Sequence, residues 1–116
     1  MKPQSAKAKG RKLQQDTIKL LNKYFFELEE DDLRSTSMGA GGEDILMSPK
    51  AKKLIGLSIE CKNQEKIAVY NWLDQAASNA GRAVPVVVAK SNNRKPIVIM
   101  DAEFFFAVLS ERNMRD

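Results

Sequence analysis

Apolar side chains recur with the period of a helix in two stretches of the chain. Between residues 12 and 28 they fall every three or four positions, which is typical of one face of a helix. The members of this stripe are Gln14, Ile18, Leu21, Phe25 and Leu28, and the glutamine is a polar member. A second helix is predicted to follow Glu65 and to stop at Gly81. Its expected inner face carries Ile67, Tyr70, Leu73, Ala77 and Ala80.

Shorter apolar runs between and after these helices predict strands. The predicted strands are Leu33–Ser37, Glu43–Met47, Leu54–Lys62, Val84–Lys90 and Ile97–Met100. The loop Met38–Gly42 is rich in glycine, and Ser48–Lys53 is predicted to be a turn that makes the second and third strands a hairpin. Val84–Lys90 is apolar almost throughout, which indicates a strand buried on both faces.

The last helix is predicted to begin at the capping residue Asp101 and to run through Leu109. The order α-β-β-β-α-β-β-α then predicts one α/β domain with a central mixed five-stranded sheet flanked by helices. Phe104–Phe106 put aromatic rings on more than one side of the last helix. They are either buried in a larger core or form an exposed partner surface, for which a twofold homodimer is the commonest explanation.

Composition narrows the possible chemistry. The 116 residues include no histidine and one cysteine, which excludes Ser-His-Asp and Cys-His catalysis, histidine metal sites and an internal disulfide. The net charge is +4, and five of the basic residues lie in residues 1–12 without any acid. We interpret 1–12 as a basic N-terminal arm that contacts nucleic acid or only solvates the terminus, and 13–116 as the domain. Because no apolar run approaches the length of a membrane span, we expect a cytoplasmic protein without a membrane partner.

One strand carries the most informative residues. In an extended strand, Glu60 and Lys62 point to one face while Cys61 points to the core. Asp44 lies 16 residues before Glu60, and the predicted hairpin brings the two carboxylates together. Two close carboxylates favour a cation between them, and hard oxygen ligands suit Mg²⁺ or Mn²⁺. Such a site can activate water and neutralise a phosphate without histidine.

Asp44 followed by Glu60-Cys61-Lys62 resembles the D-x(n)-E-x-K signature of the PD-(D/E)XK nuclease superfamily. The likeness extends to Lys9-Gly10, Arg34-Ser35 and the strand Val84–Lys90. Together these features look like the archaeal-type Holliday junction resolvases and their phage-encoded relatives, over about residues 9–109.

This resemblance implies a restriction-endonuclease-like domain that nicks branched DNA, such as four-way junctions, as a homodimer. It implies a phage-encoded enzyme in the host cytoplasm that needs Mg²⁺, or Mn²⁺ as a substitute, and no small-molecule cofactor. Asp44, Glu60 and the carbonyl of Cys61 would hold the metal, and Lys62 would position the attacking water. Gln75 resembles a glutamine that some members add to the site. The expected DNA contacts are Lys9, Arg11, Arg34, Ser37, Gly39, Gly41, Gly42 and Lys90.

The chain departs from the resolvases at Gln14, where they have a glutamate. The amide can still hold a metal or its water as a catalytic-site residue, but it brings no charge, so we expect weaker metal binding. The alternative is that Gln14 is an ordinary polar residue at the start of the helix. Two other functions stay open: a nuclease of the same fold acting on other DNA, such as a nickase or repair nuclease, and a non-catalytic DNA-binding protein on a nuclease scaffold. A small protein-interaction module would leave the face of Glu60 and Lys62 unexplained.

Overall fold

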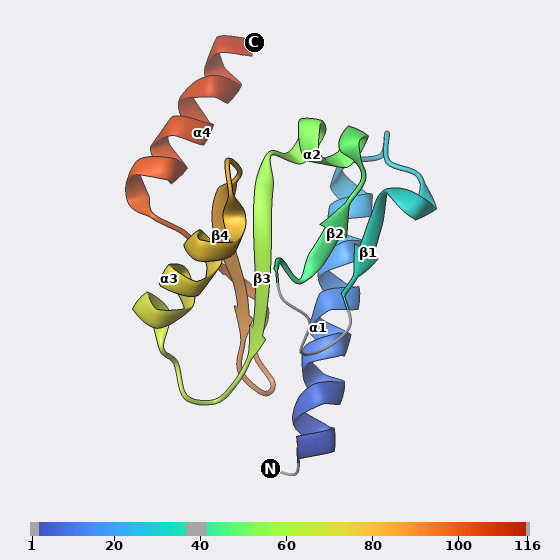
Figure 1. Cartoon of the computed structure of the whole chain (residues 1–116), viewed down its shortest axis with the longest axis vertical. Coiled ribbons are helices and arrows are strands. Elements are labelled where there is room, and N and C mark those ends of the chain that lie inside the picture. The colour runs from blue at the N-terminus through green and yellow to red at the C-terminus, as the bar shows by residue number, and fades with distance from the viewer. Residues whose placement is uncertain (1–2, 37–41, 116) are drawn as a thin grey trace.

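The computed structural model describes residues 3–36 and 42–115. Their elements are α1 (Pro3–Tyr24), the short 3-10 helix η1 (Glu30–Asp32), β1 (Leu33–Ser35), β2 (Ile45–Met47), α2 (Pro49–Ile55), β3 (Leu57–Asn63), α3 (Val69–Ala80), β4 (Val84–Lys90), β5 (Ile97–Ile99) and α4 (Ala102–Arg115). The predicted α/β class is confirmed. Figure 1 shows β3 and β4 near the middle of the molecule, with α3 and α4 towards one side and α1 towards the other. No helix in the described part of the chain has the length and apolarity needed to cross a membrane.

The strands form two sheets, so the predicted single five-stranded sheet is wrong. β1 and β2 form an antiparallel pair. In the other sheet β4 is central, parallel to β3 and antiparallel to β5. The two sheets meet just before β2, where the amide of Asp44 donates a hydrogen bond to the carbonyl of Ile59 at 3.1 Å.

A helix, α2, occupies the segment where a turn and the start of a strand were predicted. Ser48 caps α2 by accepting a hydrogen bond from the amide of Ala51 at 3.1 Å, and Pro49 begins its first turn. Gly56 ends it in the left-handed region, with φ 71°. Proline suits the start of a helix and glycine suits a left-handed end, so these residues favour a short helix. Because α2 intervenes, β2 and β3 are not a hairpin, and β3 begins at Leu57.

The first helix begins earlier and ends earlier than predicted. α1 already includes residues 3–12, so this part of the expected basic arm is helical. The segment contains two alanines, three lysines and an arginine, which have high helix propensity. The buried side of α1 carries Leu13, Gln14 and Thr17, with Ile18 and Leu21 partly buried beside them. The helical stripe is therefore confirmed as far as Leu21, and the chain leaves the helix after Tyr24.

Two apolar clusters lie against opposite faces of the sheet that contains β4. The first joins α1 and the small sheet to one face, and its buried members are Leu13, Leu33, Ile45, Met47, Ala51, Ile59, Cys61 and Val88. The second joins α3 to the other face through Trp72, Ala76, Val87 and Ala89. The alternation of Val87 and Val88 between the clusters confirms that β4 is buried on both faces.

The inner face of α3 differs from the predicted one. Trp72 and Ala76 are buried, and Leu73 of the predicted face packs against their cluster, whereas Tyr70 and Ile67 are exposed. The large indole buries the most apolar surface when it faces the sheet, and the small Ala76 beside it allows close approach. In a short helix, apolar residues spaced three or four apart can be drawn along more than one neighbouring face. Periodicity alone therefore predicted a face turned away from the one that carries Trp72 and Ala76.

The last helix begins as predicted and extends beyond its predicted end. The Oδ1 atom of Asp101 accepts hydrogen bonds from the amides of Glu103 and Phe104, at 2.9 and 3.3 Å. In Figure 1, α4 projects from the body of the molecule. Phe104, Phe105 and Phe106 are all exposed, so the buried alternative is wrong for this chain.

Candidate active site

Asp44 is fixed at the place where the two sheets meet. Besides the bond from its amide to Ile59, its carboxylate Oδ2 accepts a hydrogen bond from the amide of Cys61 at 2.8 Å. Its carbonyl accepts hydrogen bonds from the amide and the hydroxyl of Thr36, at 3.0 and 3.2 Å. These bonds hold the Asp44 carboxylate against the edge of β3 although β2 and β3 are not a hairpin.

Glu60 lies in β3 next to this carboxylate and is only 3% exposed. Its Oε1 accepts a hydrogen bond from the Nδ2 of Asn79 in α3 at 2.8 Å. Burial raises the pKa of Glu60 above its ordinary value; the bond from Asn79 opposes this rise, and the neighbouring charge of Asp44 adds to it. Two carboxylates that disfavour each other's charge gain stability from a proton or a cation between them.

Lys62 follows Glu60 on the same face of β3. The register pairs Glu60 with Val87 and Lys62 with Ala89, and both partners belong to the cluster under α3. Ile59 and Cys61 face the opposite cluster. The predicted alternation along this strand is confirmed. Lys62 is half-buried, and its charge lies near enough to lower the pKa of Glu60, against the larger effect of burial.

Seven predicted residues line a single cleft of about 620 Å³. They are Gln14, Gly42, Asp44, Glu60, Cys61, Lys62 and Gln75. Gly42 has φ 91°, and the wall also includes Lys7 of α1 and Asn79 of α3. The cleft therefore joins residues that are far apart in sequence, from α1, the segment before β2, β3 and α3.

Gln14 and Cys61 have clear structural positions in this cleft. Gln14 is 2% exposed, so it lies well inside α1 rather than at a frayed helix start. The Cys61 thiol is buried and donates a weak hydrogen bond to Thr17 Oγ1 at 3.8 Å. Burial raises the pKa of this thiol to about 12. Because the thiolate is the reactive form, the cysteine side chain is a core group here and not a nucleophile.

The donor set of the cleft suits a hard divalent cation. Within residues 3–36 and 42–115, no three His, Cys, Asp or Glu side chains come together as a metal site. The available oxygens are the carboxylates of Asp44 and Glu60, the Gln14 amide and the Cys61 carbonyl. In a strand, the amide and the carbonyl of one residue point toward the same edge. The Cys61 amide donates to Asp44, so the Cys61 carbonyl lies on the same edge of β3 as the Asp44 carboxylate. Such oxygens fit Mg²⁺ or Mn²⁺, and two carboxylates fit one ion better than two.

The other predicted DNA-binding residues are less closely grouped. Ser37, Gly39 and Gly41 lie outside the described residues. Lys9 donates a hydrogen bond from its Nζ to Asn92 Oδ1 at 2.8 Å, which ties α1 to the turn between β4 and β5. Arg11 and Arg34 are exposed away from the cleft wall, and Lys90 lines a neighbouring hollow.

The sequence reasoning missed Asn79 and did not select Lys7 individually. Asn79 stands four residues after Gln75, so both lie on one side of α3. That spacing was a usable signal, since a second amide on the side that carries Gln75 points to the same cleft. Lys7 was hidden within the run of basic residues that was assigned to an arm.

Comparisons of the chain with protein-family models, curated proteins and solved structures give no match. The likeness to the PD-(D/E)XK nucleases therefore depends on the motif and its surroundings alone. The geometry itself establishes two adjacent carboxylates, two lysines and five amide side chains around one cleft.

Proposed function

We propose that the chain is a metal-dependent DNA endonuclease that cleaves phosphodiester bonds, with branched DNA such as four-way junctions as its substrate. One observation carries the proposal: the Asp44 carboxylate is held on the amide of Cys61, beside the buried Glu60 and on the strand that also presents Lys62. Lys62 offsets only part of the repulsion between the two carboxylates, so their proximity at a cleft favours a further cation between them.

Each residue of the cleft has a distinct task in this proposal. Asp44, Glu60 and the carbonyl of Cys61 would hold Mg²⁺ or Mn²⁺, which when bound acidifies water and neutralises a phosphate. Lys62 would orient the attacking water and offset charge on the phosphate as it develops. Asn79 keeps Glu60 in one orientation by donating to Oε1. Gln14 would accept a hydrogen bond from a water molecule or supply one uncharged oxygen.

The surroundings of the cleft support a polyanionic substrate. Lys7 lines the cleft, and Lys9 is fixed beside the turn between β4 and β5. The net charge of +4 adds a general attraction to phosphates. We expect recognition of backbone shape and charge rather than of base edges.

We also propose that the chain acts as a homodimer. The exposed apolar residues of α4 are Phe104, Phe105, Phe106, Val108 and Leu109. Large apolar side chains that are exposed together mark partner surfaces. A dimer would give a junction two cleavage sites, one for each of two opposing strands.

A second function, DNA binding without cleavage, is favoured by one observation. Gln14 removes a negative charge from the buried wall of the cleft, where the resolvases that the chain resembles have a glutamate. If the remaining carboxylates bind the metal too weakly, the scaffold would bind branched DNA and leave it intact.

The deciding experiment compares a synthetic four-way junction with a linear duplex of the same sequence. Each is incubated with the protein in Mg²⁺, in Mn²⁺ and in EDTA, and the products are resolved on denaturing gels. We expect symmetric nicks in the junction that are absent in EDTA and in Lys62→Ala. Lys53→Ala, on the exposed side of α2, is the matched control and should cleave like the unchanged chain.

Three other results are informative. Equal cutting of both substrates would support a less selective nuclease. Tight junction binding without cutting in either metal would support the non-catalytic function. Cutting by Lys62→Ala at the full rate would contradict the assignment of the site.

A further inference from the structure

A second hollow lies next to the cleft, at the end of the sheet where β3 and β4 finish. Its volume is about 560 Å³, within the ~300–1,000 Å³ typical of small-molecule sites. It is formed by the loop before α3, the side of β5 and the turn that joins β4 to β5. Gln64, directly after β3, lines both this hollow and the cleft. A strand leaving the cleft past Lys62 therefore meets the hollow next.

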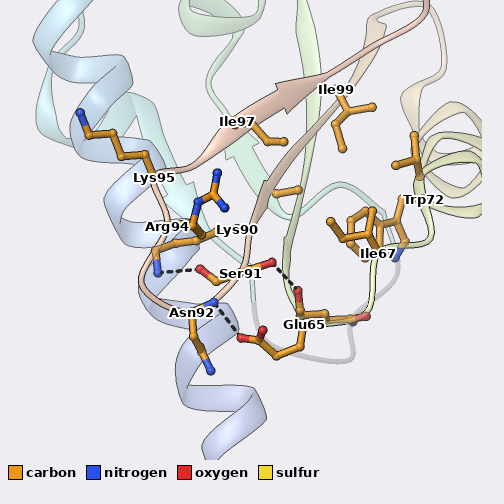
Figure 2. Close-up of a pocket in the computed structure, with 13 residues that line it drawn as sticks. Glu65, Ile67, Trp72, Lys90, Ser91, Asn92, Arg94, Lys95, Ile97 and Ile99 are labelled. Atoms are coloured by element: carbon orange, nitrogen blue, oxygen red, sulfur yellow. Dashed lines mark hydrogen bonds between the residues drawn. The ribbon is translucent and has the colours of Figure 1, made fainter.

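The walls of this hollow have two different characters (Figure 2). Apolar side chains from α3, its preceding loop and β5 line one side: Ile67, Trp72, Ile97 and Ile99. Lys90, Arg94 and Lys95 lie on the other side. Trp72 is buried and presents little more than an edge, whereas Ile67 and Ile97 are 59% and 57% exposed. The accessible apolar surface is therefore mainly aliphatic.

The charges around the hollow are mostly positive. The one acidic residue in its wall, Glu65, accepts a hydrogen bond at its Oε1 from the amide of Asn92, at 2.8 Å. Lys90 makes a long contact of 3.4 Å from its Nζ to the carbonyl of Ser91. Among the described residues, the guanidinium of Arg94 and the ammonium of Lys95 have no hydrogen-bond or ion-pair partner. Two cationic groups are thus available to an anion.

We propose that this hollow binds one unpaired nucleotide of the DNA strand that passes through the cleft. The base would pack against Ile67 and Ile97, and its flanking phosphates would contact Arg94 and Lys95. An apolar ring with adjacent negative charge matches the two walls, whereas a base kept in a duplex could not enter the hollow. The inference rests on the proposed function, which gives the path of the DNA strand through the cleft. It extends that function, because the hollow would favour DNA that has unpaired nucleotides beside the cleavage site.

The test measures binding in EDTA, so that cleavage plays no part. Fluorescein-labelled DNA probes are a duplex, the same duplex with a short single-stranded flap and a fully paired four-way junction. Fluorescence anisotropy gives the dissociation constant of each probe at a fixed salt concentration. We expect the flap to bind more tightly than the duplex, because only the flap can supply an unpaired base.

The variants Ile97→Ser and Ile67→Ser should each reduce the preference for the flap by about tenfold, as expected when roughly one buried aliphatic side chain is lost. Val98→Ser is the matched control. Val98 is also exposed on β5, at 62%, but it pairs with Val88 and faces the opposite side of the sheet. It should leave the preference unchanged. Arg94→Gln should weaken binding of the flap and lower its salt dependence, because one phosphate contact is lost.

Several outcomes would overturn the nucleotide site. These are an unchanged flap preference in Ile97→Ser and Ile67→Ser, an equal loss in Val98→Ser, or equal binding of flap and duplex by the unchanged chain. Ile67 lies in a loop, so its variant still tests the idea if the substitution in β5 disturbs folding, which circular dichroism would detect. Light scattering tests whether the hollow is instead a contact between two chains. In that case Ile97→Ser would convert a dimer to a monomer, whereas Val98→Ser would not.

Failure here can be separated from failure of the proposed nuclease. If the chain cleaves DNA and the cleavage depends on Lys62 while the flap preference is absent, only the nucleotide site is wrong. If the flap preference responds to Ile97 but no metal supports cleavage, the nucleotide site stands and the nuclease proposal fails.

Discussion

The hydrogen bond from Asn79 to Glu60 offers the sharpest test of the site. Its removal shows whether Asn79 stabilises the negative charge of Glu60 or contributes only packing. Asn79→Ala removes the 2.8 Å bond to a carboxylate that is only 3% exposed. A hydrogen bond to a charged group contributes about 1.5–3 kcal/mol. Asn79 is partly exposed, so we expect about 1.5 kcal/mol, which corresponds to a fall in Tm of about 6 °C for a chain of this length.

The dependence on pH follows from the direction of the pKa shift. Burial and the charge of Asp44 raise the pKa of Glu60 in the folded chain, and the bond from Asn79 restrains that rise. Between the ordinary value of 4.5 and the raised folded value, the folded chain binds more protons than the unfolded chain, so its stability falls as the pH increases through this range. Asn79→Ala raises the folded pKa further. The destabilisation should therefore be full at pH 7 and smaller near pH 4, where Glu60 carries a proton in both states.

Urea unfolding of the metal-free chain at pH 7 and at pH 4 measures both quantities. Ser78→Ala is the matched control, because its hydroxyl donates within α3 to the carbonyl of Gln75 at 2.8 Å and is exposed. It should cost less at pH 7 and show no comparable change with pH. An equal loss of stability for Asn79→Ala at both pH values would refute the electrostatic explanation and leave Asn79 as a packing residue.

The remaining predictions concern the metal and the dimer. Asp44→Asn should remove both cleavage and the increase in Tm that Mg²⁺ produces. The metal-free variant should stay folded, because an amide oxygen can still accept the hydrogen bond from Cys61. An unchanged increase in Tm with Mg²⁺ would exclude Asp44 as a metal ligand. Gln14→Glu should lower the Mg²⁺ concentration at half-maximal effect in thermal melts and destabilise the metal-free chain at pH 7, since a third carboxylate enters the cleft. Phe106→Asp should shift the monomer–dimer equilibrium toward monomer in light scattering, whereas Tyr24→Asp, exposed on α1, should not.

The parts of the fold that the sequence could predict depend on local patterns. The alternation in β3 placed Glu60 and Lys62 on one face correctly, because a strand has only two faces. The apolar run of β4 correctly predicted burial on both sides, and Asp101 correctly marked the start of α4. Each of these conclusions needs only neighbouring residues and the geometry of one element.

The wrong predictions required knowledge of contacts between elements. Reading Ser48-Pro49 as a turn joined β2 to β3 and produced a five-stranded sheet, although serine before proline also begins helices. The same misreading nevertheless brought Asp44 close to Glu60. Two hydrogen bonds from backbone amides, and not a hairpin, bring Asp44 close to Glu60. The amide of Asp44 donates to the carbonyl of Ile59, and the amide of Cys61 donates to the carboxylate of Asp44.

This difference changes how the carboxylate pair should be understood. In a hairpin, the separation of Asp44 and Glu60 would depend on the register of a whole ladder, and a slip by one residue would turn Asp44 away. Here the Asp44 side chain is bonded directly to the strand that carries Glu60, so the two carboxylates stay together even if the small sheet shifts. The cleft wall on the other side depends on α3, where Trp72 anchors the helix and Asn79 orients Glu60. The carboxylate pair is therefore determined by side-chain bonds across β3 more than by sheet pairing, which is why the approach of Asp44 to Glu60 could be predicted from an incorrect sheet.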